Sequence, residues 1–336
     1  MRLARPAGLL LAAVGAVLWA VNMTVLQPLT EPLGPWSERF PGNNAYWARD
    51  LRFATIVAVV LGLLLAGRGD RWWSRTAVLL GGAWVAADLA VDRADPTGAG
   101  ATVLLAAAGC AVVAAVATPL VRREMRAPAP GPDRPVLTGA ACVAGVLTLV
   151  AATIESPTDR EPELNPAAFT TGALLVVVAV AAALAAAPAA TRARCWLAVG
   201  LGAAAVLGVG LLRTTAPGTR MLPQLALSAV LLTGVTLLAW DWPGGRPDWG
   251  RQGLAALAAL VGPTAMMVVA ALLTMTLRIG APFTALAGNS PINSADSDIL
   301  YSLVGVLAGL GMALLLANRL AFADAPVAGR PARPQP

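Results

Sequence analysis

The sequence QPLTEPLGPWSERFPGNNAYWARDLR, residues 27–52, is the longest polar interruption in a strongly apolar chain. It separates two apolar runs, residues 6–26 and 51–67, that are each long enough to cross a bilayer. Prolines at positions 28, 32, 35 and 41 exclude a continuous helix over its first part. Asn44 is a suitable N-cap, so we expect a helix to begin near Ala45 and to continue through the second run.

Further along the chain, the same pattern of apolar runs continues. A bilayer core of about 30 Å takes about 20 helical residues, and ten runs fit, at residues 6–26, 51–67, 76–92, 101–121, 136–154, 169–188, 195–212, 223–240, 253–277 and 299–317. The chain is 57% hydrophobic and 12% charged, with a mean hydropathy of +0.70, which is far from soluble usage. We therefore expect an all-α, polytopic integral membrane protein of about ten transmembrane helices, with residues 1–322 forming one membrane domain.

The first run also fits a secretory signal peptide, because Arg2 and Arg5 precede it. Leu18-Trp19-Ala20 places a bulky residue where a cleavage site needs a small one. We expect an uncleaved first helix.

The arginines predict the orientation, because cytoplasmic connections carry an excess of basic residues. With a cytoplasmic N-terminus, 16 of the 24 basic residues lie inside and the remaining eight lie outside, at Arg39, Arg49, Arg52, Arg93, Arg160, Arg213, Arg220 and Arg278. Several of the outer arginines are at span ends, where they are expected to anchor to headgroups. Both termini are thus predicted to be cytoplasmic, and the Pro-rich tail, residues 323–336, is predicted to be disordered.

Composition also limits the chemistry. The absence of histidine removes His-based triads, His-ligated metals and His-based pH switches. Cys110, Cys142 and Cys195 lack CxxC spacing and are expected to be small buried residues, so we expect no metal site and no cofactor. The net charge of +6 could suggest nucleic acid, but the arginines flank apolar runs and form no aromatic-interleaved patch, so we expect no nucleic-acid binding.

All basic residues are arginine, and alanine, glycine and proline are abundant. This bias indicates a GC-rich bacterial genome. The expected location is therefore a bacterial cell (plasma) membrane, with the lipid bilayer as the main partner.

Asp88 is the ionisable residue placed clearly inside an apolar run, and such residues are functional candidates because a charge in lipid is costly. Asp92 and Asp95 follow at i+4 and i+7, so the three would form one acidic stripe if the helix continues that far. Such a stripe would suit proton or cation binding. The alternative is an interfacial carboxylate paired with Arg93 or Arg52. Asn22, in the first run, is a further polar candidate.

Pro263 and Thr264 interrupt the ninth run and predict a kink or a break into half-helices. Broken helices line substrate sites in many transporters, whereas other kinks serve packing alone. Glycines at 200, 202, 208 and 210, together with Gly305 and Gly309, permit close helix contact, either within the chain or with a homo-oligomer or other membrane partner.

The polar stretch supplies a second group of candidates for binding. They are Glu31, Trp36, Glu38, Tyr46, Trp47, Arg49, Asp50 and Arg52. One interpretation is that this loop and residues 278–298 form a mouth at the outer face. The other is an aromatic-anchored connector that rests on the bilayer surface.

An internal repeat is also suggested. The lengths of the outer loops fit a four-span unit used twice, at residues 6–121 and 136–240, and begun a third time at 253–317. The segment RADPTG at 93–98 resembles RTTAPG at 213–218.

Three functions are compatible with these features. The first is a secondary transporter or permease for a small solute, since size and topology resemble the ten-span drug/metabolite transporter superfamily, although a four-span repeat and the long first and last outer loops depart from it. The second is an enzyme that acts on a lipid-linked substrate at the outer face. The acidic loop after the first span resembles that of polytopic glycosyltransferases that use polyprenyl-phosphate sugars. This resemblance implies that Glu31, Glu38 or Asp50 is a base or metal ligand. The third is a non-catalytic subunit of a membrane complex. Transport is the expectation that the sequence favours.

Overall fold

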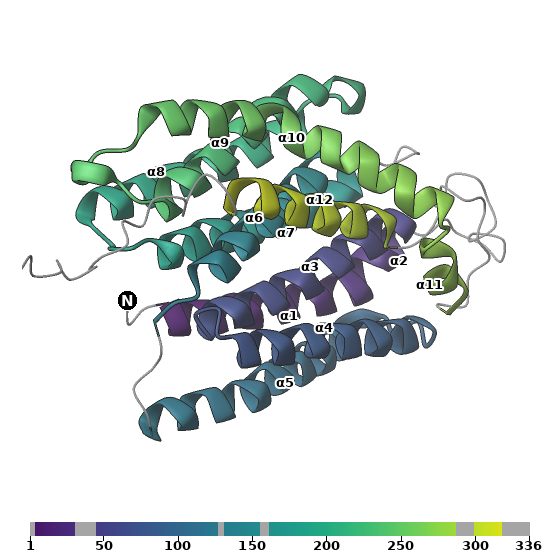
Figure 1. Cartoon of the computed structure of the whole chain (residues 1–336). Coiled ribbons are helices and arrows are strands. Elements are labelled where there is room, and N and C mark those ends of the chain that lie inside the picture. The colour runs from purple at the N-terminus through teal and green to yellow at the C-terminus, as the bar shows by residue number, and fades with distance from the viewer. Residues whose placement is uncertain (1–3, 31–44, 127–130, 155–160, 287–298, 318–336) are drawn as a thin grey trace, which may run out of the picture.

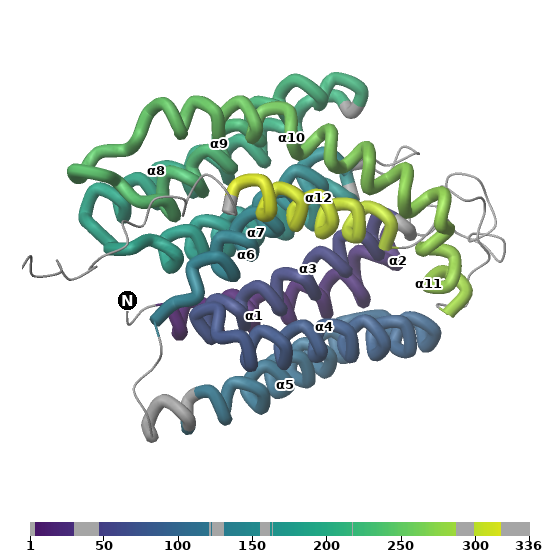
Figure 2. Tube along the Cα trace, viewed as in Figure 1, coloured from purple at the N-terminus to yellow at the C-terminus, as the bar shows by residue number. Residues whose placement is uncertain are grey.

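The computed structural model describes residues 4–30, 45–126, 131–154, 161–286 and 299–317 (Figures 1 and 2). Every regular element within these ranges is a helix. The elements are α1 (Ala4–Val21), the π-helix η1 (Asn22–Leu26), α2 (Gln27–Thr30), α3 (Ala45–Ala66), α4 (Arg71–Asp92), α5 (Gly98–Arg126), α6 (Arg134–Thr153), α7 (Glu161–Ala186), α8 (Arg192–Thr214), η3 (Pro217–Thr219), α9 (Met221–Ala239), η4 (Pro243–Gly245), α10 (Trp249–Thr276), α11 (Gly280–Leu286) and α12 (Leu300–Ala317). The predicted tail at 323–336 lies outside the described residues.

Eight helical stretches in the described ranges are long and apolar enough to cross a membrane. They are Ala4–Leu29, Arg71–Asp92, Gly98–Leu120, Arg134–Thr153, Leu164–Ala186, Arg192–Thr214, Met221–Ala239 and Trp249–Thr276. The other two predicted runs fall on α3, which carries charged residues in its first two turns, and on α12, whose apolar stretch Leu300–Leu316 is shorter. The all-helical architecture is therefore that of a multi-pass membrane protein.

The core of the bundle lies around α6 and α7. In the most apolar 18-residue stretch of α6, 83% of the residues are buried, whereas the corresponding share in α10 is 17%. Helix α6 is therefore central and α10 is peripheral. Helix α3 packs between α1 and α4, while α8, α9 and α10 cover the opposite side of the α6–α7 pair (Figure 1). α12 lies against α6 and α10 and also contacts α3.

Two glycines bring α1 and α3 into backbone contact. A Cβ atom built on Gly8 would lie 2.5 Å from the backbone oxygen of Gly62, and one built on Gly62 would lie 2.9 Å from the backbone oxygen of Gly8. Only residues without a side chain permit this approach. It holds the first turns of α1 directly beside the last turns of α3.

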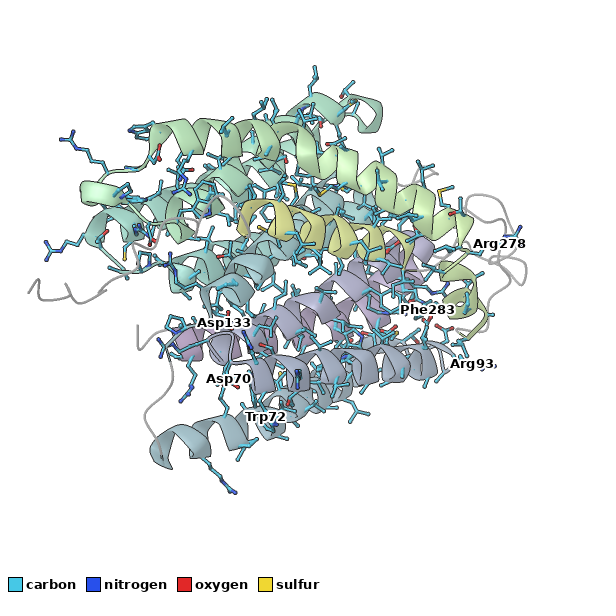
Figure 3. The ribbon with its side chains drawn as sticks, in the orientation of Figure 1. Asp70, Trp72, Arg93, Asp133, Arg278 and Phe283 are labelled. Atoms are coloured by element: carbon cyan, nitrogen blue, oxygen red, sulfur yellow. The ribbon has the colours of Figure 1, made fainter. Side chains whose placement is uncertain are left out.

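Four helices begin at the same end of the bundle with a capping side chain. Asp70, Asp133, Thr191 and Asp248 accept hydrogen bonds from backbone N–H groups in the first turns of α4, α6, α8 and α10. Figure 3 shows Asp70 and Asp133 toward one end of the bundle, with Arg93 and Arg278 at the opposite end. The sequence places each of these caps where a helix must start, because Asp and Thr oxygens satisfy otherwise unpaired N–H groups.

Arginine side chains cap the carboxyl ends of other helices. Arg134 donates to the carbonyl oxygens of Ala186 and Ala239, and Arg194 donates to those of Leu238 and Trp240. At the other end, Arg213 and Arg220 both donate to the carbonyl oxygen of Ile154. Arg213 and Arg220 are 6% and 3% exposed, so these two arginines are held by helix contacts and not by headgroups. The four terminal carbonyls of a helix have no partner within it, and these guanidinium groups supply one.

The glycines of α12 serve packing within the chain. A Cβ atom at Gly309 would lie 2.5 Å from the Cα of Val143, and one at Gly305 would lie 2.6 Å from the side chain of Leu147. Both contacts join α12 to α6. Gly200 and Gly202 of α8 have no atom within 4 Å of such a Cβ, so a contact with another chain through that face stays a prediction.

Candidate functional site

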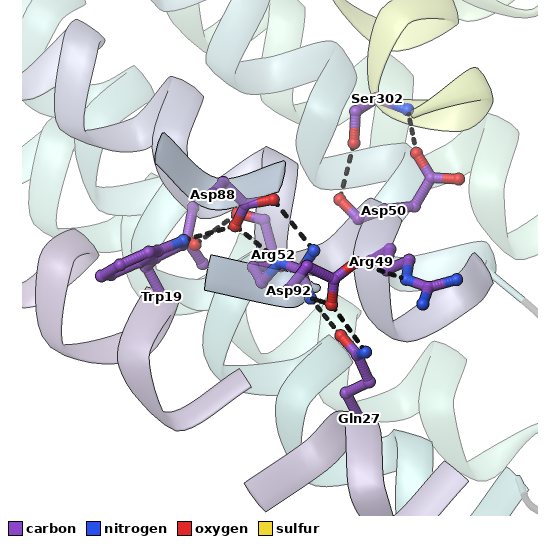
Figure 4. Close-up of polar contacts among 9 residues, drawn as sticks. Trp19, Gln27, Arg49, Asp50, Arg52, Asp88, Asp92 and Ser302 are labelled. Atoms are coloured by element: carbon purple, nitrogen blue, oxygen red, sulfur yellow. Dashed lines mark hydrogen bonds and ion pairs between the residues drawn. The ribbon is translucent and has the colours of Figure 1, made fainter. Parts of the chain in front are cut away.

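A buried group of charged and polar side chains lies where the first turns of α3 meet the last turns of α4 (Figure 4). We call it the Arg52 network, and its members are Trp19, Gln27, Arg49, Arg52, Asp88 and Asp92. Arg49 and Arg52 project from α3, Asp88 and Asp92 from α4, and Trp19 and Gln27 from α1 and α2. The close contact of α1 with α3 is what brings Trp19 and Gln27 within reach.

Asp88 is 0% exposed and uses both carboxylate oxygens. Its Oδ1 accepts the indole N–H of Trp19 at 2.7 Å and lies 2.7 Å from Nε of Arg52. Its Oδ2 accepts Nη2 of Arg52 at 2.9 Å. Asp88 is thus paired with Arg52, one of the two arginine partners that the sequence suggested, and the pair is buried inside the helix bundle.

Asp92 lies one helical turn further along α4. Its Oδ1 accepts Nε2 of Gln27 at 2.7 Å and Nη1 of Arg52 at 3.2 Å, and its Oδ2 accepts Nε of Arg49 at 3.0 Å. Nη1 of Arg52 also donates to Oε1 of Gln27. Two arginines and two aspartates therefore share one set of contacts, and their formal charges sum to zero.

Mutual neutralisation is what permits four formal charges at this depth. Removing an isolated charge from water costs several kcal/mol, and only a close counter-charge with further hydrogen bonds offsets that cost. Here the Arg52 guanidinium meets both carboxylates, and Trp19 and Gln27 donate the additional hydrogen bonds. The network is built as a closed structural joint between α3 and α4.

Asp50 points away from this network and joins α3 to α12. Its carboxylate accepts the backbone N–H of Ser302 at 2.8 Å and that of Tyr301 at 3.3 Å, and its backbone carbonyl accepts the hydroxyl of Ser302 at 2.6 Å. Asp50 is 1% exposed. A carboxylate from one helix thus caps the N-terminus of another, where the partial positive charge of the helix favours an anion.

Beside this contact lies a cavity of about 420 Å³, which we call the Trp47 cavity. It is bounded by α3, α6, α9, α10 and α12, and the residues that line it are Trp47, Val150, Thr153, Ile154, Gln224, Thr264, Met267, Val268, Ala271, Met275, Leu300, Tyr301 and Val304. The rings of Trp47 and Tyr301 stack with centroids 4.6 Å apart. None of the lining residues that the structure describes is charged. Three of them, Thr153, Gln224 and Thr264, carry neutral polar side chains that can form hydrogen bonds.

Pro263 lies inside α10 without dividing it into two half-helices. Proline lacks a backbone N–H, so the carbonyl oxygen of Ala259, four residues earlier, loses its helical donor. The hydroxyl of Ser228, from α9, donates to that oxygen at 2.6 Å. A neighbouring helix therefore satisfies the freed carbonyl, as in many membrane helices that contain proline. Thr264, the next residue, lines the Trp47 cavity and lies near the middle of α10.

The structure separates the predicted candidates into groups. Asp88, Asp92, Arg49 and Arg52 meet in the Arg52 network, Asp50 lies beside it, and Trp47 and Thr264 line the cavity. The acidic stripe stops at Asp92, because α4 ends there and Asp95 sits in an exposed turn with φ of 45°. Glu31, Trp36 and Glu38 lie outside the described residues, as does the side chain of Tyr46.

Asn22 does not join the Arg52 network. It lies in η1, is 2% exposed, and its side-chain nitrogen has no hydrogen-bond partner among the described residues. A π-helical turn inserts an extra residue per turn and often occurs at functional sites. Here it also sets the rotation of α2, on which Gln27 lies.

Sequence reasoning missed Trp19, Gln27, Ser228, Tyr301 and Ser302. All five act through partners more than 20 residues away in the chain. A local signal existed only for Ser228, because a proline in a membrane helix implies that some neighbouring hydroxyl satisfies the freed carbonyl. The pairing itself depends on which helices pack together.

The described ranges contain no cluster of side chains that is suited to bind a metal cation. No group of three or more Asp, Glu, Cys or His side chains there is placed to hold a metal ion. Cys142 is buried, Cys110 is half-buried and Cys195 is exposed, and none forms a disulfide. Cys195 therefore departs from the expectation of a buried residue.

No protein-family model matches the chain, and comparisons with curated proteins and with solved structures returned no significant match.

Proposed function

We propose that the chain is a ten-helix carrier of the cell membrane that binds a small, largely apolar, uncharged solute in the Trp47 cavity. The observation that carries this proposal is the cavity itself, about 420 Å³ in volume, with mainly apolar walls, a stacked aromatic pair and a few polar side chains. Small-molecule sites in proteins have this size and composition. The described lining is uncharged and favours a neutral solute, since a charged one would lose its hydration without gaining a counter-charge from these residues.

The position of the cavity also supports a carrier. Thr264 lies midway along α10, whereas Met275 and Leu300 lie at one end of the bundle. The cavity therefore extends from about the middle of the helices to that end. Secondary transporters place their substrate sites near the bilayer midplane, between helices that can move against each other.

We infer that α3 and α12 are the two further spans, which makes ten. With 22 and 18 residues, they are about 33 and 27 Å long at 1.5 Å per residue, enough for the hydrocarbon core. The charges in the first turns of α3 do not oppose this, because Arg49, Asp50 and Arg52 are all buried in contacts with other helices.

The arginine contacts strengthen the inferred orientation. Of the six arginines assigned outside whose side chains the structure describes, Arg49, Arg52, Arg213 and Arg220 are buried in helix contacts, which leaves two. Of the ten described arginines assigned inside, Arg194 is buried in this way, which leaves nine. The basic residues outside the packed bundle thus favour cytoplasmic termini more strongly than the full set does. In this orientation the Trp47 cavity lies in the outer half of the membrane.

Helices α10 and α12 are the elements whose movement would open and close the cavity. Their contact uses glycine and methionine: a Cβ atom at Gly262 would lie 2.8 Å from the sulfur of Met312, and one at Gly311 would lie 2.6 Å from that of Met266. Methionine side chains are flexible and adapt to different packing. Such an interface allows a small sliding movement without loss of contact.

The enzyme alternative gains no support from the described carboxylates. Asp50, Asp88 and Asp92 are buried and occupied by hydrogen bonds to protein groups, so none is placed as a base for a substrate at the surface. Trp47, an aromatic residue of the predicted outer mouth, lines the cavity, whereas these carboxylates belong to structural contacts.

Cysteine labelling tests the proposal. In a background with Cys110, Cys142 and Cys195 replaced by alanine, Thr264→Cys would be treated with a membrane-impermeant methanethiosulfonate, once on intact cells and once on inside-out vesicles. A carrier exposes its central site to each side in turn, so we expect modification in both preparations. N-phenyl-1-naphthylamine, a neutral apolar fluorophore, should slow the reaction severalfold by occupying the cavity.

Thr274→Cys is the matched control, since Thr274 lies on the same helix, is 1% exposed and does not line the cavity. It should react slowly from both sides. Modification of Thr264→Cys from the outside alone would contradict a carrier and indicate a binding or subunit role. Reaction no faster than that of Thr274→Cys from either side would contradict the binding site.

A further inference from the structure

A second cavity lies at the opposite end of the bundle, between the first and second halves of the chain. Its volume is about 300 Å³. We call it the Arg68 groove, and the residues that line it are Ala4, Ala7, Leu65, Arg68, Ala181, Leu184, Ala185, Ala190 and Cys195. They come from α1, α3, α7, α8 and two connecting turns. The described walls are apolar apart from Arg68, which is the charged residue among the described lining residues.

The backbone fixes Arg68 at this position. It follows α3 with φ of 56°, in the left-handed region, and its carbonyl oxygen accepts the backbone N–H of Asp133 at 3.0 Å. The turn is thus held against the start of α6, and this contact keeps Arg68 among the residues that line the groove. Arg5, in the first turn of α1, is close enough to Arg68 for the two positive charges to repel each other.

The surroundings of the groove have the features of a membrane–water interface. Trp72 and Trp196, at the starts of α4 and α8, are 57% and 75% exposed, and exposed tryptophans of membrane helices concentrate at headgroup depth. Figure 3 shows Trp72 at the same end of the bundle as Asp70 and Asp133. The groove therefore reaches from this interface toward the apolar interior.

We propose that the Arg68 groove binds an anionic phospholipid, with its phosphate at Arg68 and an acyl chain along the alanines of α1 and α7. An arginine that lines an apolar groove between membrane helices, with the positive charge of Arg5 nearby, complements such a molecule in charge and in hydrophobicity. A free phosphate ion would use only the positive charge and leave the apolar walls unoccupied. The lipid would also bridge α1 with α7, which belong to different halves of the chain. This site is separate from the Trp47 cavity and does not depend on the carrier proposal.

Cys195 provides a natural reporter, because it lines the groove and is exposed, whereas Cys142 is buried. We would use the full chain with Cys110→Ala, in nanodiscs of phosphatidylcholine alone or with phosphatidylglycerol, and measure alkylation of Cys195 by N-ethylmaleimide. Bound phosphatidylglycerol should slow this reaction about fivefold or more. Native mass spectrometry of the same samples should show retained phosphatidylglycerol.

Three variants make the test specific. Arg68→Asn removes the charge but keeps a residue that tolerates the left-handed conformation, and it should abolish the protection and lower phosphatidylglycerol retention about fivefold. Ala181→Leu should fill the groove and displace the lipid. Arg75→Gln, an equal charge change at an exposed position of α4 that does not line the groove, should behave as wild type.

The outcomes are distinct. Equal retention and protection in Arg68→Asn and wild type would overturn the proposal, as would an equal loss in Arg75→Gln, since the effect would then be one of surface charge. Protection of Cys195 by inorganic phosphate in phosphatidylcholine discs would also overturn it, because the ligand would be the free anion.

Discussion

Replacing Arg52 with methionine would leave Asp88 and Asp92 buried with Arg49 as their nearest remaining counter-charge. Removing one partner of a buried ion pair costs about 3 to 5 kcal/mol, and Arg52 is 0% exposed and contacts both carboxylates. We expect a large fall in the thermal unfolding temperature of the purified protein in detergent, followed by intrinsic tryptophan fluorescence.

The double variant Arg52→Met with Asp88→Asn tests the cause of that fall. It leaves Arg49 and Asp92 as a balanced pair at 3.0 Å, so it should be more stable than Arg52→Met alone. If the stability lost in the double variant equals the sum of the losses in the two single variants, Arg52 and Asp88 do not stabilise each other.

Ser228 and Pro263 should be coupled. Ser228→Ala removes the donor to the carbonyl oxygen of Ala259, and we expect a loss of about 1 kcal/mol, in the range of hydrogen bonds between membrane helices. In a Pro263→Ala background the backbone N–H at 263 can satisfy that carbonyl, so the same Ser228→Ala change should cost less. A double-mutant cycle of unfolding free energies measures the coupling, and a value of zero would mean that the two residues act independently.

At the scale of single residues, the sequence indicated which residues would be unfavourable to bury. It did not indicate which partners would offset that free-energy cost. Asp88 was identified because it is an acid within an apolar run, and Pro263 because it removes a helical donor. Their partners Trp19 and Ser228 lie 69 and 35 positions away in the chain, and only helix packing brings them close. Local spacing carries no information about such pairs.

The N-terminus of α12 should depend on Asp50. Asp50→Ala removes the acceptor for the N–H groups of Tyr301 and Ser302, and losing an N-cap costs about 1 to 2 kcal/mol. We expect faster hydrogen–deuterium exchange over the first turn of α12, read by mass spectrometry. Asp50→Asn keeps an acceptor oxygen and should show a smaller change.

Asp248→Ala is the matched control for this element. Asp248 caps α10 at the opposite end of the bundle, through the N–H groups of Gly250 and Arg251. The control should increase exchange at the start of α10 and leave α12 unchanged. If Asp50→Ala left exchange in α12 at the wild-type rate, the cap between the two helices would be refuted.

Helices were the most predictable part of the chain, for a physical reason. Backbone groups in lipid must form hydrogen bonds within their own segment, so a long apolar run is a helix wherever it packs. The ten predicted runs accordingly fall on helices, and α3 begins at Ala45 as the N-cap argument expects. The π-helix η1 and the short helix α11 were not predicted, because one inserted residue or two turns leave no clear periodic pattern.

The whole molecule shows a related order of packing in its two halves. Helix α1 packs against α3 and α5, and α3 against α4; likewise α6 packs against α7 and α9, and α7 against α8. A four-span repeat predicts these shared pairings. Its halves are not identical, since α9 also packs against α7 and α8. The repeat stays a prediction, and the similar segments 93–98 and 213–218 occupy the corresponding connections.

The orientation of the whole molecule can be tested at two exposed turn positions that differ in side but not in residue type. Ala94 lies in the turn after α4 and Ala189 in the turn after α7, at opposite ends of the bundle. If the arginines outside the packed core decide orientation, an impermeant maleimide added to intact cells should label Ala94→Cys and not Ala189→Cys, in the cysteine-free background. Inside-out vesicles should reverse the result. Labelling of Ala189→Cys in intact cells would place the Trp47 cavity in the cytoplasmic half of the membrane. It would also show that the buried arginines must be counted when the orientation is predicted.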